Sequence, residues 1–175
     1  MEVPSALSRC AGGHQGACQA GRTNLTEMSR SYWGMTPRES VEQECVRRGK
    51  RDVVAGCVEL LTSGDGDPDL ILALGGPPAR WVITGAPSGP DYWLRVWALR
   101  GLLWAWDGVA FPAVEAALQD DAWRVREMAL KVIARHQLDD ATAAVAGLQE
   151  DVNARVRAAA SRALMRLAAG GTAPS

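Results

Sequence analysis

The sequence predicts an all-α protein, a short solenoid built from antiparallel helix pairs that stack side by side. Two observations support this fold class. A sequence motif occurs three times at a constant spacing in the second half of the chain, and its apolar residues follow the periodicity of one helix face. No stretch alternates between apolar and polar residues for long enough to require a β-strand.

The three copies of the motif begin at Leu94, Val125 and Val156, so each step along the chain is 31 residues. In every copy an arginine directly follows the first residue, and an alanine lies four residues after that first residue. The repeat positions on which the fold depends are Leu94, Arg95, Ala98, Val125, Arg126, Ala129, Val156, Arg157 and Ala160. A second amphipathic segment separates the copies. Because one helix pair cannot bury its apolar stripe alone, the fixed period favours stacked pairs over a simple helical bundle.

These residues resemble the HEAT repeat family, in the variant that is compared with the repeats of phycobilisome lyases. The carriers are Asp121-x3-Val125-Arg126-x2-Ala129-x2-Val132-Ile133 and Asp151-x4-Val156-Arg157-x2-Ala160-x2-Ala163-Leu164. The first copy departs from the pattern, with Leu94 in place of Val and Gly101 in place of a bulkier residue. The resemblance covers residues 91–169 well and 36–84 weakly. It implies that the arginine after the first motif position pairs with an aspartate of an adjacent repeat.

The chain is expected to have a disordered leader over residues 1–34, a solenoid over 35–170 and a flexible tail over 171–175. Order is expected to begin at Thr36-Pro37-Arg38-Glu39, which has the residue types of a helix capping box. Helices are expected over 36–48, 52–61, 70–74, 92–105, 111–119, 123–136, 140–149 and 153–168, with a further short segment at 81–83.

Composition excludes several classes of protein. The chain has 175 residues, of which 47% are hydrophobic, so it can bury a core as one domain. A net charge of −1 gives no overall attraction to nucleic acid or to membranes. No apolar run approaches the length of a membrane span, and the first residues do not resemble a secretory signal. We therefore expect a cytoplasmic protein whose four cysteines are thiols.

No motif indicates catalysis, a metal or a cofactor. Cys10, His14 and Cys18 have a C-x3-H-x3-C spacing, but a zinc site needs a fourth ligand and none lies nearby. We interpret them as incidental residues of the leader. Phosphate-binding loops, dinucleotide fingerprints, nucleophile elbows and the His-Glu pairs of di-iron HEAT hydroxylases do not occur in the sequence.

The helices that carry the motif share a second stripe, which lies away from the predicted core. All ten basic residues of segment 91–169 lie in these helices, and Glu127 is the only acidic residue inside them. In HEAT proteins such second helices line the concave surface, so the resemblance implies a basic concave ridge with tryptophans at its early end. The candidate partner-binding residues are Trp93, Trp97, Arg100, Trp104, Arg124, Lys131, Arg135, Arg155, Arg162 and Arg166.

Structural explanations for this stripe stay open. Arginines on exposed helix faces are commonly solvated, and acids at helix starts complement the helix dipole. Tryptophans also fill cores, which is our interpretation of Trp81, Trp106 and Trp123. For the three tryptophans of the stripe, both a core role and a binding role remain open, since exposed aromatic residues mark binding sites. These residues are Trp93, Trp97 and Trp104.

The expected function is that of a non-catalytic scaffold that binds a protein partner through its second helices, without a cofactor, a metal or a membrane. The alternative is a nucleic-acid-binding protein. A weak resemblance to alkylpurine DNA glycosylases, which also use HEAT-like repeats, would make Trp93 and Trp97 stack on a base and Asp91 or Asp107 act as the acid. The spacing of these residues matches no motif of that family, so the protein partner is preferred.

Overall fold

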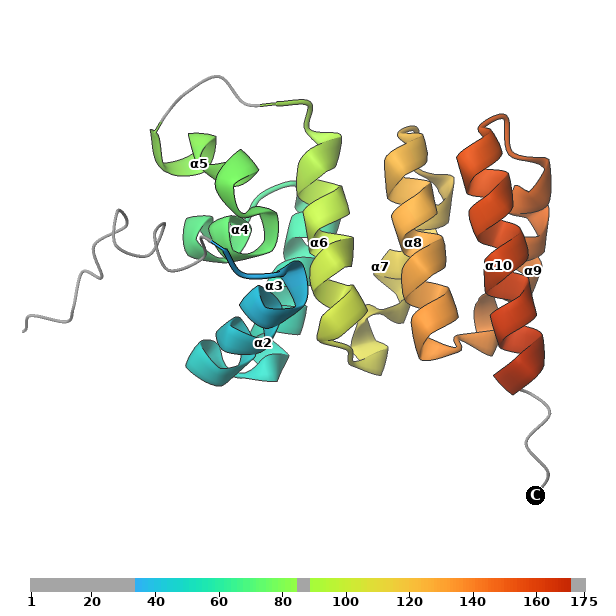
Figure 1. Ribbon diagram of the computed structural model, residues 1–175, viewed down its shortest axis with the longest axis horizontal. Helices are drawn as coiled ribbons and strands as arrows, with labels where there is room; N and C mark the ends of the chain where they lie inside the picture. Colours follow the sequence, from blue (N-terminus) through green and yellow to red (C-terminus); the bar gives the residue numbers. More distant parts are fainter. Residues whose placement is uncertain (1–33, 85–88, 171–175) are drawn as a thin grey trace, which may run out of the picture.

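The computed structural model describes residues 34–84 and 89–170, and every regular element in these ranges is a helix. Figure 1 shows α6, α8 and α10 standing side by side, with α7 and α9 behind them. The predicted all-α solenoid is therefore confirmed. Residues 1–33 of the predicted leader, including Cys10, His14 and Cys18, and the predicted tail lie outside the described residues.

The second half of the chain consists of helix pairs with a long second helix. The second helices are α6 (Tyr92–Trp104), α8 (Trp123–His136) and α10 (Ala154–Gly170). The first helices are short: α7 (Phe111–Ala116) and α9 (Thr142–Gly147) each lie between 3-10 turns. Both predicted first helices are thus present, but their end turns tighten into 3-10 geometry, which is common at helix termini.

The first half is less regular. It contains α2 (Pro37–Arg48), α3 (Lys50–Ser63), α4 (Pro68–Gly75) and α5 (Trp81–Thr84). The predicted capping box is present, since the Thr36 hydroxyl accepts from the Glu39 amide and the Glu39 carboxylate accepts from the Thr36 amide. Gly49, with φ 93°, ends α2, and α3 starts directly after it, two residues earlier than predicted.

The first positions of the motif face inward, as the stacking requires. Val125 and Val156 are fully buried, and Leu94 is partly buried against the same core. The alanines four residues later, Ala98, Ala129 and Ala160, have no exposed surface. Small side chains at these points let neighbouring helices approach closely, so one continuous core runs through the stack.

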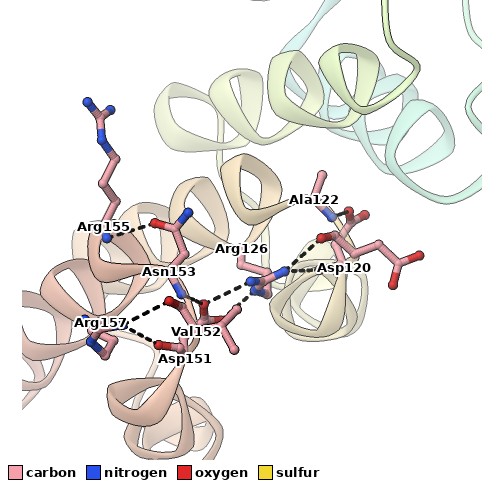
Figure 2. A network of polar contacts seen from close by, with 9 residues as sticks. Asp120, Ala122, Arg126, Asp151, Val152, Asn153, Arg155 and Arg157 are labelled. Carbon is pink, nitrogen blue, oxygen red and sulfur yellow. Dashed lines mark hydrogen bonds and ion pairs between the residues drawn. The ribbon is translucent and has the colours of Figure 1, made fainter.

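An arginine–aspartate ladder joins successive pairs, as the family resemblance implied, and Figure 2 shows its second pair, Arg126 and Asp151. Arg95 Nε donates to Asp120 Oδ2 at 2.6 Å, and Arg126 donates through Nε and Nη2 to the two oxygens of Asp151 at 2.7 and 3.0 Å. Each aspartate also accepts from a backbone amide two residues later, which fixes the loop before α8 or α10. The equivalence of Asp121 with Asp151 in the motif was wrong. Asp120 lies 31 residues before Asp151, and it is Asp120 that forms the ion pair with Arg95.

Gly101 joins the irregular half to the repeats. A Cβ atom at this position would lie 2.5 Å from Cys57 Sγ of α3 and 2.8 Å from Leu74 Cδ2 of α4. Gly101 replaces a bulkier residue of the motif, and the side chains of Cys57 and Leu74 occupy the space that this leaves.

We expect Gly101→Ala to lower the free energy of unfolding by about 1–3 kcal/mol, because the added methyl group overpacks this contact. Urea denaturation followed by circular dichroism measures the change. Gly147→Ala is the matched control: this glycine also lies in a helix, but a Cβ there meets nothing within 4 Å. The control variant should be as stable as the parent or slightly more so, and equal losses in the two variants would contradict the overpacking explanation.

Candidate partner-binding site

The exposed side of α8 and α10 carries a groove that we call the basic groove. It has a volume of about 250 Å³ and is lined by four cations at equivalent positions of the two helices, Lys131, Arg135, Arg162 and Arg166. Apolar side chains line the rest of it, among them Leu103 of α6 and Leu130 of α8. Four of the predicted partner-binding residues are thus brought together over an apolar floor.

The charges in this groove are poorly compensated. Lys131 Nζ forms an ion pair with Glu127 at 2.9 Å. The other three cations form no ion pair within the part of the chain that the structure describes. Arg135 instead lies over the ring of Trp104, with its guanidinium carbon 4.2 Å from the ring centroid. Such a contact holds the side chain in place and leaves its charge uncompensated.

A second cluster of arginine and aromatic side chains lies at the other end of α6 and α8. The guanidinium of Arg124 is 4.3 Å from the ring of Trp123, 5.6 Å from that of Trp93 and 5.7 Å from that of Tyr92. Arg155 of α10 approaches the same Trp123 at 5.5 Å. The aromatic rings are partly buried, so the cluster combines apolar surface with two cations.

Tyr92 and Trp123 were not predicted as partner-binding residues. Trp123 was interpreted as a core residue, but it is only partly buried and lines a surface pocket together with Tyr92 and Arg124. Tyr92 and Trp123 are separated by 31 residues and so occupy the same position in successive repeats. That periodicity was a usable signal for both residues.

Two stripe residues on α6 are not available to a partner. Trp97 is only 3% exposed, and Arg100 is partly buried and donates to the backbone oxygen of Leu74 at 3.3 Å. Burial lowers the pKa of Arg100 from its usual value. The predicted ridge across all three second helices is therefore wrong at α6, because α2 and α4 pack against this helix. Trp93 and Trp104 remain partly exposed.

Cys57 and His136 are held in the packing of the fold. Burial raises the pKa of the Cys57 thiol to about 12, which makes it a poor nucleophile. His136 stacks on Trp106 with the ring centroids 4.7 Å apart, and its Nε2 lies 3.0 Å from the oxygen of Leu102. In residues 34–84 and 89–170 no three His, Cys, Asp or Glu side chains gather as metal ligands. No helix there combines the length and apolar character needed to cross a membrane.

The described helices form an array of stacked pairs, which is the class of proteins called α-solenoids. Residues 80–165 match the family model for HEAT repeats, so this segment of the chain is similar to HEAT repeats. Neither a curated protein nor a solved structure gave a match. HEAT repeats generally mediate protein interactions, which agrees with the scaffold that the sequence predicts.

Proposed function

We propose that this protein is a non-catalytic scaffold whose basic groove binds an acidic segment of a partner protein. The observation that carries the proposal is the charge of this groove: four cations and no acidic residue line it, and Lys131 alone among them forms an ion pair in the described ranges. Complementary charge steers a partner to such a surface and fixes its register. Partly buried tryptophan and arginine side chains, the residue types that dominate binding energies, extend the surface along α8.

A protein partner is favoured over nucleic acid by two observations. Trp97, one of the two residues expected to stack on a base, is buried. Asp107, one of the two candidate acids, accepts from the amide of Val109 at 3.1 Å and caps the turn before α7. A cytoplasmic location and the closer likeness to phycobilisome-lyase repeats are further proposals that accompany this function.

The test uses a fluorescein-labelled peptide of alternating glutamate and leucine, and its glutamine analogue as the uncharged probe. Fluorescence anisotropy should detect tighter binding of the glutamate peptide to the wild-type chain. The double variant Arg162→Glu/Arg166→Glu should weaken this binding about tenfold or more, because like charges then face each other. The double variant Lys50→Glu/Arg51→Glu has the same net charge change at two residues of α3 that do not line the groove, and it should bind nearly as well as wild type.

Equal affinity for the two peptides, or undiminished binding by the groove variant, would overturn the proposal. Labelled duplex DNA tests the alternative. Binding through roughly five phosphates predicts a log–log salt slope of about −4 to −5. Tighter binding of the duplex with this slope would replace the acidic peptide by nucleic acid as the ligand.

A further inference from the structure

Arg157, at the outer side of α10, is held like an arginine of the ladder (Figure 2). Its Nη1 donates to the backbone oxygens of Asp151 at 2.8 Å and Val152 at 3.1 Å. Arg126 Nη1 donates to the oxygens of Asp120 at 2.6 Å and Asp121 at 3.1 Å, which are the equivalent residues one repeat earlier. Equivalent pairs of carbonyl groups, one repeat apart, therefore orient the two guanidinium groups.

The two arginines differ in what their other nitrogens contact. Nε and Nη2 of Arg126 hold the Asp151 carboxylate, and the Arg126 side chain is only 12% exposed. Arg157 is exposed, and no carboxylate forms an ion pair with it in the described ranges. Two donors of a correctly oriented fork, a geometry that suits bidentate carboxylate binding, thus point to solvent.

The surface around Arg157 is apolar or small. Val152 is 93% exposed and Met165 is 64% exposed. Ala158 and Ser161, which are also exposed, lie between them on α10. We call these residues together with Arg157 the end face. Ser161 and Met165 are the counterparts, 31 residues on, of Leu130 and Ala134 of α8, which lie against α10.

We propose that the end face docks a helical hairpin of another protein chain, which brings an aspartate or glutamate to Nε and Nη2 of Arg157. The end face continues the interfaces that already join the helix pairs. At α6–α8 and at α8–α10 the same arginine position meets a carboxylate in the loop before the next long helix. Small and apolar residues on the end face then allow the close helix contact that the internal interfaces have. This inference uses a different surface from the basic groove and does not rest on the proposed function.

The test extends the full chain by one repeat. A copy of residues 140–170 inserted after Gly170 places a second Asp151 25 residues beyond Arg157, the separation found in both internal pairs. Circular dichroism should show added helix, and the melting temperature should rise. Arg157→Ala should then lower the melting temperature of the extended protein by roughly 6 °C or more, whereas in the original chain the loss should be about 2 °C or less. Asp→Asn at the inserted copy of Asp151 should reproduce the larger loss.

Two results would overturn the proposal. The first is an inserted repeat that adds no helix, or an Arg157→Ala effect that is equally small in both proteins. The second concerns the occupant and is measured by sedimentation of the original chain over a range of concentrations. A dimer that Arg157→Ala abolishes would identify a second copy of this chain, instead of a different protein, as the occupant.

Discussion

Arg126→Ala is expected to lower the free energy of unfolding by about 3–5 kcal/mol, the range for breaking a buried ion pair. Asp151 is 6% exposed and would keep its charge without its main partner. The variant also removes both hydrogen bonds that Nη1 donates to the oxygens of Asp120 and Asp121. Urea denaturation followed by circular dichroism measures the loss.

Arg157→Ala is the matched control for this experiment. It removes the equivalent pair of hydrogen bonds, to the backbone oxygens of Asp151 and Val152, at an exposed position without breaking an ion pair. Its cost should be about 1 kcal/mol or less. Similar losses in the two variants would mean that the Asp151 carboxylate contributes nothing to the stability of the stack.

The cost of Arg126→Ala should also depend on pH. The hydrogen bond from Arg126 holds the pKa of Asp151 below its ordinary value of 3.8. A carboxyl group with a depressed pKa in the folded state stabilises the protein above its unfolded pKa, and this stability is lost as the pH falls through the folded value. The difference in the free energy of unfolding between wild type and Arg126→Ala should therefore be constant near neutral pH. It should shrink as the pH falls below 3.8, the ordinary pKa of an aspartate.

Trp97→Ala is expected to destabilise the domain by about 3–5 kcal/mol, as for other buried aromatic residues. The side chain is 3% exposed, and it packs so closely on α4 that a Cβ at Gly75 would lie 2.8 Å from its ring. Trp93→Ala is the control, because this ring stacks on Trp97 from the same helix but is only partly buried. Trp93→Ala should lower the free energy of unfolding by about 1–2 kcal/mol.

Thermal unfolding of the two variants distinguishes a core residue from a binding residue. The peptide titration is repeated well below the lower melting temperature, where both variants are folded. A stable Trp97→Ala variant that bound the glutamate peptide weakly would contradict the buried position and return Trp97 to the binding surface.

The regular half of the fold follows from local sequence patterns. The predicted helix over 123–136 coincides with α8, because its apolar residues mark one face and polar loops bound it on both sides. The ladder also follows from the repeat, although the period had to be applied to Asp120 and not to its neighbour Asp121. Repetition of this kind makes long-range contacts predictable, since each pair meets its neighbours in the same way.

The irregular half was harder to predict because its contacts are not repeated. Nothing near Trp97 in the sequence indicates that α4 covers it. Its counterparts in the next two repeats, Met128 and Ala159, are partly buried and buried, so the period was a usable signal for its burial. Glu44 of α2 was missed for a related reason. It is fully buried, and its carboxylate accepts hydrogen bonds from Arg47 and Arg48. The spacing of three and four residues was the available signal, but the same spacing is common on exposed helices.

The long helices differ in how many neighbours hold them. α6 packs against α3 and α4 on one side and α8 on the other, whereas α10 packs against α8 and its own short helix α9. In an array with nearest-neighbour contacts, the unit with one neighbour opens at the lowest free energy. Since α8 and α10 each supply half of the cations in the basic groove, separation of these two helices would remove that groove while α6 stayed in place. A ligand bound between α8 and α10 would hold these two helices together and so stabilise their contact.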